Sequence, residues 1–165
     1  MKNKLFRLSL IWIFYLFFTS SFADELNINA LEVHVDKDTK MITVPRVVSA
    51  IAGGKILNPK TAESQILGGI TWGISMALEE EGMMDSRNGR IMNANLAEYH
   101  VAVQADIQDL EVIFVPEHDE IVNPLGAKGL GEIGIVGVAS AICNAIYNAT
   151  GKRVRELPIT LDKLV

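Results

Sequence analysis

The chain has 165 residues, one cysteine, and 15 Lys and Arg against 20 Asp and Glu, which gives a formal net charge of −5. This length suffices for one domain with a sizeable core. The acidic balance without a basic run argues against nucleic-acid binding and against an anionic membrane surface, because phosphate contacts need clustered Lys or Arg. One cysteine excludes an intrachain disulfide and an iron–sulfur cluster held by this chain alone, and the scattered histidines form no metal-binding motif.

The first residues are typical of a secretory signal peptide. A basic start is followed by an apolar run over 8–18, and Ser21 and Ala23 are the small residues that a signal peptidase recognises. An uncleaved membrane anchor is the alternative, but this run would span only about 16 Å as a helix, against a hydrocarbon core of ~30 Å. We therefore predict a signal peptide over 1–23 with cleavage after Ala23, one domain over 24–165, and a periplasmic or secreted protein.

Two β-rich segments at the start of this domain predict a hairpin. Residues 31–35 alternate apolar and polar side chains, 36–40 are typical of a turn, and 41–51 are rich in β-branched residues. Pro45 interrupts the second segment. Because proline donates no hydrogen bond to a sheet, it implies an edge strand or a bulge.

A long helix is predicted over 60–81, with Asn58 as its N-cap and Pro59 at its first position. Glycines inside it each cost about 1 kcal/mol relative to alanine. They are Gly68, Gly69 and Gly73. Two explanations stay open: tight packing against another element, which we favour, or contact with a ligand. Gln65 lies in the same stripe of small residues, where a buried amide would need hydrogen-bond partners.

The middle of the chain is predicted to be mostly loop. Residues 83–94 indicate a loop with a turn at 87–89, 110–115 indicate a strand, and 117–120 indicate a charged surface turn. Near the C-terminus, 154–157 indicate a short strand or an extended segment.

A glycine-rich turn over 126–134 carries a single acid, Glu132. Apolar residues at helical spacing follow it, so we predict a helix over 132–149 that ends at the capping pair 150–151. Two interpretations stay open from these residues alone: an acid that stabilises a helix N-terminus, or an active-site base presented by a glycine turn. The turn has no GxxxxGK[ST] motif and fits GxGxxG poorly, so nucleotide binding is only weakly indicated. Cys143 has no basic neighbour on this helix to activate it, and we expect a buried structural thiol.

Several short motifs follow one another in a fixed order. They are GKILNP (54–59), SQILGG (64–69), YHV (99–101), NPLGAKGLGE (123–132), NAIYNATG (144–151) and VRELPIT (154–160). Each is unspecific alone, but together they are specific. From about Leu31 to the C-terminus, the chain resembles the last portion of the large, molybdopterin-binding subunit of molybdenum hydroxylases, the xanthine dehydrogenase and aldehyde oxidase family. The segments are most similar to those of its periplasmic aldehyde-oxidising branch.

This resemblance implies a site. The family's glutamate in the corresponding turn lies beside the molybdenum and acts as the base, which implies that role for Glu132. The resemblance further implies that part of the cofactor wall is formed by the backbone of Lys128, Gly129, Leu130 and Gly131. Gln65 matches a glutamine that hydrogen-bonds the pterin. The implied cofactor is a molybdenum–pterin cofactor, and the implied reaction is oxidation of aldehydes or N-heterocycles.

In the family, the large subunit extends much further on the N-terminal side, where the other cofactor loops and most of the substrate pocket lie. We therefore expect a truncated or split gene product that needs the rest of a large subunit, together with iron–sulfur and flavin subunits, to be active. The alternative is an exported, non-catalytic remnant or binding module that keeps the fold without the cofactor. In both cases we predict an α+β fold, in which a mixed sheet with an N-terminal β-hairpin packs against helices 60–81 and 132–149 and leaves an apolar interface uncovered.

Overall fold

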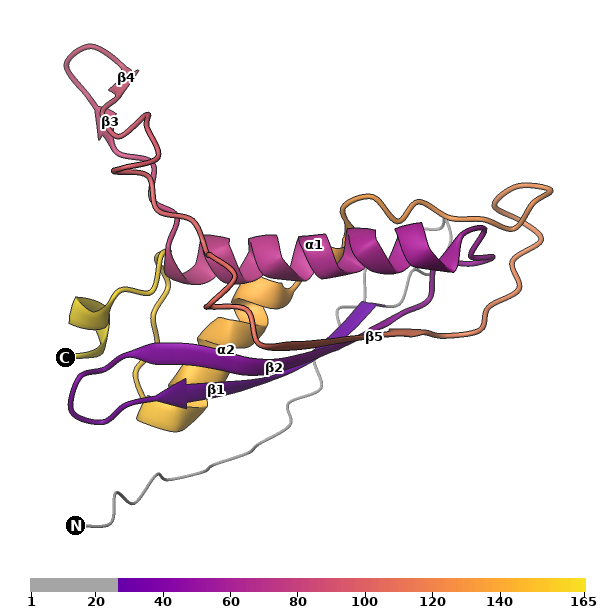
Figure 1. Cartoon of the computed structure of the whole chain (residues 1–165), viewed down its shortest axis with the longest axis horizontal. Coiled ribbons are helices and arrows are strands. Elements are labelled where there is room, and N and C mark those ends of the chain that lie inside the picture. Colours follow the sequence, from indigo (N-terminus) through magenta and orange to yellow (C-terminus); the bar gives the residue numbers. More distant parts are fainter. Residues whose placement is uncertain (1–26) are drawn as a thin grey trace.

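The structure is a computed structural model that describes residues 27–165, so the predicted signal peptide lies outside the described residues. The main elements are the strands β1 (Asn27–Val35), β2 (Ile42–Ile51) and β5 (Asp109–Phe114) and the helices α1 (Pro59–Leu78) and α2 (Val138–Thr150). Figure 1 shows α1 running along the sheet, and α2 crossing it. Helix α2 packs against β1, whereas α1 packs against β2 and β5 as well as against α2. The predicted α+β class, with a mixed sheet and two main helices, is confirmed.

The sheet has the order β1-β2-β5, with β1 and β2 antiparallel and β2 and β5 parallel. The predicted hairpin is therefore confirmed. Val44 and Pro45 together lie opposite Val33 where the register shifts, so Pro45 lies in a bulge of the central strand rather than in an edge strand. Pairing of β2 with β5 begins only at Arg46. The hydrogen bond that proline cannot donate is thus not needed there.

Helix α1 begins as predicted. The side-chain oxygen of Asn58 accepts a hydrogen bond from the backbone N–H of Thr61 (3.3 Å), and Pro59 is the first helical residue. The helix ends at Leu78, before the predicted Glu81, because the N–H groups of the next two residues both donate to the carbonyl of Ser75 and the regular ladder stops.

The second predicted helix, over 132–149, is wrong at its start. A short 3-10 turn, η1 (Ile133–Ile135), is separated from α2 by Gly137, which has a φ of 83°. The side-chain amide of Asn27 donates to the carbonyl of Ile133 (2.6 Å), and that of Asn29 donates to the carbonyl of Val136 (2.9 Å). These carbonyls would accept from the chain itself in a continuous helix, so capture by β1 divides the segment in two.

The core lies between the sheet and the two helices. Its completely buried side chains include Val47 and Ile51 on β2, Ile66 and Ile70 on α1, and Val138, Ile142 and Ile146 on α2. Each helix therefore turns one apolar stripe towards the sheet.

The crossing of α1 with η1 and α2 is tight because glycines line it. A Cβ added to Gly69 would lie 2.8 Å from the backbone of Gly134, and one added to Gly73 would lie 2.6 Å from the Cβ of Val138. The packing explanation for these two α1 glycines is confirmed. Gly68 faces open space.

One stretch of the described residues, Ile133–Thr150, is long and apolar enough to cross a membrane, judged by length and composition only. It is not one continuous helix, because Gly137 breaks it. Val138, Ile142 and Ile146 belong to the domain core. Only 22% of the stretch is buried in the domain, and length and composition alone are weak evidence for a membrane span.

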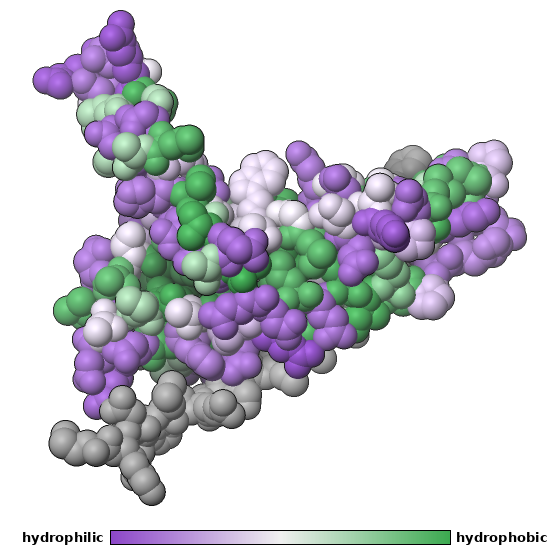
Figure 2. All heavy atoms as spheres, viewed as in Figure 1, coloured by the Kyte–Doolittle hydropathy of each residue, from purple (hydrophilic) through white to green (hydrophobic). Residues whose placement is uncertain are grey.

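The predicted loop over 83–94 contains a small antiparallel pair, β3 (Met84–Asp85) and β4 (Arg90–Ile91). The turn at 87–89 is confirmed, and Gly89 adopts a φ of 69° in it. This arm projects away from the rest of the domain (Figure 1), and Figure 2 shows hydrophobic side chains along it. Its exposed apolar side chains include Met83, Met84, Ile91 and Met92. The expected uncovered apolar surface is therefore present.

The C-terminal segment packs against the end of α1. Residues 154–157 form no strand. Instead, the backbone N–H of Ile159 donates to the carbonyl of Ala77 (2.7 Å), and Leu164 is buried in the 3-10 turn η2 (Leu161–Leu164).

Candidate functional site

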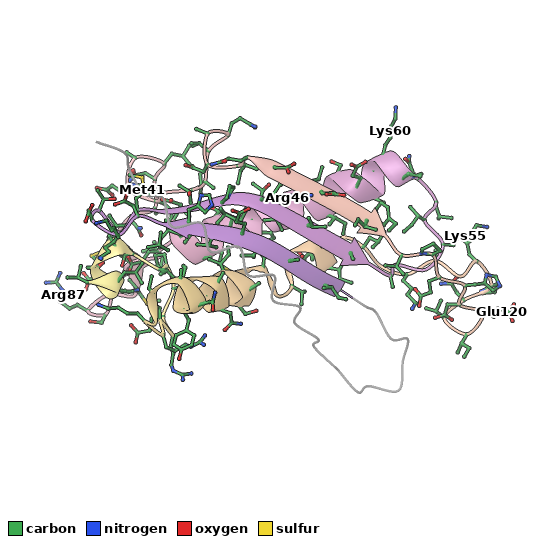
Figure 3. All side chains as sticks on the ribbon, turned by 90° about the horizontal axis from the view of Figure 1, so that it is seen from below. Met41, Arg46, Lys55, Lys60, Arg87 and Glu120 are labelled. Carbon is green, nitrogen blue, oxygen red and sulfur yellow. The ribbon has the colours of Figure 1, made fainter. Side chains whose placement is uncertain are left out.

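The candidate site lies among loops at one end of the sheet. Because β2 and β5 are parallel, the loops that follow them leave the sheet at the same edge. Lys55 from the first loop and Glu120 from the second lie together at this end of the molecule (Figure 3). The glycine turn joins them: the backbone N–H of Lys55 donates to the carbonyl of Gly126 (2.7 Å), and Gly54 forms an isolated bridge with Ala127.

Close approach of these loops requires glycine at position 54. Gly54 has a φ of 65°, and a Cβ there would collide with the carbonyl oxygen of Gly126. The NPLGAKG part of the motif is thus held directly against the end of β2.

Glu132 is exposed and directly precedes η1. The turn after it is fixed by packing, because a Cβ on Gly134 would lie 2.7 Å from the carbonyl oxygen of Ile66 on α1. Within residues 27–165, no side-chain hydrogen bond engages the Glu132 carboxylate. A well-packed turn therefore presents an uncommitted carboxylate at the surface.

The residues immediately before Glu132 leave their backbone open. No atom lies within 4 Å of a Cβ added to Gly129 or Gly131. From Gly129 to Glu132, no backbone N–H donates a hydrogen bond to any acceptor among the described residues. Unpaired N–H groups beside open space suit the oxygen atoms of a pterin or phosphate group. The residues present therefore fit the cofactor that the resemblance implies.

Two other residues of the predicted wall face inwards. Leu130 is partly buried and packs on the core, close to Gly53. The side chain of Lys128 is only 1% exposed, and its Nζ lies 2.7 Å from Oε1 of Glu117 and 3.3 Å from Oδ2 of Asp119. At these positions only the backbone can face a ligand.

Lys128, Glu117 and Asp119 form a charged cluster in which each charge is stabilised by the opposite charge beside it. Burial acts to lower the pKa of Lys128, but hydrogen bonds to Glu117 and Asp119 outweigh it and raise the pKa above its ordinary value. The pKa of Asp119 is lowered, first by the backbone N–H groups of Val122 and Ile121 and then by Lys128. Both partners therefore keep their charges at neutral pH.

Gln65 is exposed rather than buried. Among residues 27–165 its amide has no hydrogen-bond partner. It directly precedes Ile66, whose backbone contacts Gly134. The structure thus brings Gln65 and Glu132 onto two elements in contact, and leaves both side chains available.

Cys143 is half-buried on α2, and burial raises the pKa of its thiol. A raised pKa opposes formation of a reactive thiolate at neutral pH. This agrees with the expected structural role.

Sequence reasoning missed four residues that support the site. The segment 117–120 was predicted to be a charged surface turn, yet Glu117 and Asp119 bind the buried Lys128. Burial alternates along this segment, with 117 and 119 partly buried and 118 and 120 exposed, but position 120 is also an acid, so the sequence alone did not show which acids turn inwards. The amides of Asn27 and Asn29, which hold η1, left no local signal because their partners lie more than 100 residues away.

The chain matches the family model of the molybdopterin cofactor-binding domain over residues 18–108. The aldehyde oxidoreductase molybdenum-binding subunit PaoC of Escherichia coli (strain K12) is 51% identical over 135 residues, which cover 82% of this chain and 18% of that protein. The putative xanthine dehydrogenase molybdenum-binding subunit XdhA of the same strain is 39% identical over 134 residues, with a coverage of 81% and 18%. The chain thus spans 18% of the length of each of these relatives.

Solved structures agree. Aldehyde oxidoreductase from Desulfovibrio gigas has a TM-score of 0.75 and 30% identity, over 85% of this chain and 15% of that chain. Quinoline 2-oxidoreductase from Pseudomonas putida 86 has a TM-score of 0.76 and 25% identity, over 83% and 18%. The predicted family is confirmed, and the predicted molybdenum–pterin cofactor is the cofactor class of that family. The chain belongs to the molybdopterin cofactor-binding domain family of molybdenum hydroxylases.

Proposed function

We propose that this chain forms one wall of a molybdenum–pterin site and supplies Glu132 as the base of a molybdenum hydroxylase that oxidises aldehydes or N-heterocycles. The observation that carries the proposal is the open loop from Gly129 to Glu132, with unpaired N–H groups and an uncommitted carboxylate. The 51% identity to an aldehyde oxidoreductase subunit favours aldehydes over N-heterocycles.

The proposed roles follow from what each group offers. When bound, the molybdenum cofactor supplies a Lewis-acidic metal that takes up electrons from the substrate. The carboxylate of Glu132 accepts a proton from a group within hydrogen-bond reach, since no side chain or backbone donor among the described residues competes for it. The backbone N–H groups of Gly129 and Gly131 donate to cofactor oxygens. The exposed amide of Gln65 both donates to and accepts from the pterin.

One wall is not a complete site. The relatives include proteins named as subunits, among them the gamma subunit of the 6-hydroxypseudooxynicotine dehydrogenase complex. We propose that the remainder of a large subunit supplies the other walls, and that iron–sulfur and flavin subunits carry the electrons away. The chain alone is then inactive.

The test is reconstitution of the full chain with a polypeptide that carries the remainder of a large subunit, followed by assays of bound molybdenum and of aldehyde oxidation. Glu132→Gln is expected to leave molybdenum content unchanged and to lower kcat on the order of 10²- to 10⁴-fold, because only the proton acceptor is lost. Glu156→Gln, an exposed acid elsewhere on the surface, is the matched control and should retain full activity. Equal activity of the Glu132 and Glu156 variants would contradict the proposal.

The alternative function, a binding module that keeps the fold without cofactor, gives a different result. The unmodified chain would then remain a folded monomer that binds no molybdenum and restores no activity to such a partner. Gln65→Ala also distinguishes the cofactor-binding function from the binding module, since it should weaken cofactor retention only if the pterin binds beside α1.

We also propose that the protein is exported to the periplasm or beyond. The basic and apolar start of the chain supports this, followed by small residues up to Ala23. N-terminal sequencing of the mature protein should begin at Asp24. A mature protein that retains Met1, or one confined to the cytoplasm, would contradict export.

A further inference from the structure

The motif that carries Glu132 contains one basic residue, Lys128, and its side chain is directed away from the open loop. Its ammonium group lies between two carboxylates, with Glu117 at 2.7 Å and Asp119 at 3.3 Å, and is almost fully shielded from solvent. A cofactor-facing lysine would have to be accessible. This one acts on the protein itself.

The cluster joins the chain just after β2 to two parts of the long connection that follows β5. One carboxylate oxygen of Glu117 accepts from Lys128, and the other accepts from the backbone N–H of Gly54 at 2.8 Å. The backbone N–H of Lys128 also donates to the carbonyl of Gly53 at 3.3 Å. The loops after β2 and β5 and the glycine turn therefore share one ion-paired centre.

The residues just after Lys128 have no hydrogen bonds of their own to hold them. From Gly129 to Glu132 the backbone donates no hydrogen bond among the described residues, and the two glycines face open space. At the two ends their position is set by Lys128 before them and by η1 after them, where Asn27 holds the carbonyl of Ile133 and Asn29 holds that of Val136 just beyond η1. Loss of the first anchor would leave the loop held only by the packing of Leu130 on the core and by η1.

We infer that Lys128, with Glu117 and Asp119, is a positioning group that fixes the loop bearing Glu132 and the cofactor-facing N–H groups. This inference rests on the proposed function for its consequence in catalysis, but its structural part concerns the chain alone. A flexible loop loses order when its anchor is removed, and misplacement of a base by about 1 Å can cost on the order of 10²-fold in rate.

The first test is amide hydrogen exchange on the full chain. Lys128→Met keeps most of the length of the side chain and removes the charge, and it is expected to raise the exchange rates of the Gly54, Lys55 and Lys128 amides about tenfold or more, with α2 amides unchanged. Lys128→Arg restores a cation and should return most of the protection. Lys152→Met, at an exposed position beyond α2, should change nothing.

Two outcomes would overturn the inference. One is unchanged protection of these three amides in Lys128→Met. The other is an equal rise across the loop amides and α2, which would make the cluster a general stabiliser of the fold. If Lys128→Met does not fold, Glu117→Gln supplies the same comparison, since it weakens the acceptor for Lys128 and Gly54 and leaves the lysine in place.

The second test uses the reconstituted enzyme and separates this inference from the proposed function. Lys128→Met should lower kcat about 10- to 100-fold with KM little changed, and Lys128→Arg should recover it. A looser loop with full activity in Lys128→Met would refute the positioning role and leave the function of Glu132 standing. Full activity of Glu132→Gln would refute the proposed function, whatever the hydrogen exchange shows.

Discussion

Where α1 crosses η1 and the start of α2, glycines leave no space for a side chain, whereas in the loop just before η1 they face nothing. A Cβ on Gly69 would meet the backbone of Gly134 at 2.8 Å, but one on Gly129 or Gly131 would meet no atom within 4 Å. The same residue type thus serves packing in the first region and leaves room for another molecule in the second. The sequence alone does not distinguish these uses, and the space around each Cβ does.

The largest effect is expected from filling the closed contact. Gly69→Ala should lower the free energy of unfolding by about 1 to 3 kcal/mol, because the new methyl group meets backbone that cannot move aside. The helix-propensity gain of about 1 kcal/mol is already included in that net loss. Urea unfolding of the full chain, followed by circular dichroism, measures it. Stability equal to or above that of the unmodified chain would show that this contact relaxes easily.

Acid should destabilise the two regions to different extents. The loops at the end of the sheet are held by the ion pairs of Lys128, whereas the crossing of α1 with η1 and α2 is held by packing. The folded pKa of Asp119 is lowered, so its stabilising contribution is complete above its ordinary value of 3.8 and is lost as pH falls through the lower folded value. Lys128 has the opposite sign: its raised pKa gives a contribution that is complete below 10.5 and is lost as pH rises through the folded value.

We therefore expect the amides of Gly54 and Lys55 to lose hydrogen-exchange protection below about pH 3.8, at a higher pH than the amides of α2. The control is Lys128→Met, in which this difference should largely disappear because the loop is already loose. Simultaneous loss of protection in both regions would contradict the separation.

A matched substitution one position away should have the opposite sign to Gly69→Ala. Gly68 lies in the same helix but faces open space, so Gly68→Ala should raise the free energy of unfolding by about 0.5 to 1 kcal/mol through helix propensity. The same urea experiment measures both variants. A loss of stability in Gly68→Ala would mean that the space beside it is occupied in solution, for instance by a partner chain.

Local signals in the sequence predicted most of the fold. The Asn58-Pro59 cap, the hairpin, and Gly151 as the end of α2 were all found, because caps, alternation and turns act within a few residues. The break at Gly137 was missed, since apolar spacing continues through it and its cause is an asparagine pair on β1. Hydrogen bonds between residues that are far apart in the sequence leave no local pattern in it.

The candidate site shows the same limit. The glycine turn and Glu132 were predicted from a local motif, whereas the side chain of Lys128 is held by Glu117 and Asp119, which lie earlier in the loop after β5 and outside that motif. Gln65 was expected in a buried stripe, but α1 turns Gly69 and Gly73 inwards and leaves Gln65 outside. Which residues of a stripe are buried depends on the element that packs against it, and only the fold shows that.

The smallest effect on stability is expected in the open loop, and there it is the most informative. Gly131→Ala should change the free energy of unfolding by less than about 0.5 kcal/mol, since the added methyl group meets no atom and no positive φ has to be kept. If cofactor oxygens approach this backbone as proposed, the same methyl group occupies the space they need. Molybdenum uptake in reconstitution should therefore fall while urea unfolding stays unchanged, a combination that a purely structural loop does not give. Normal uptake in Gly131→Ala would place the cofactor elsewhere, and a large loss of stability would place Gly131 with the glycines of the closed contact.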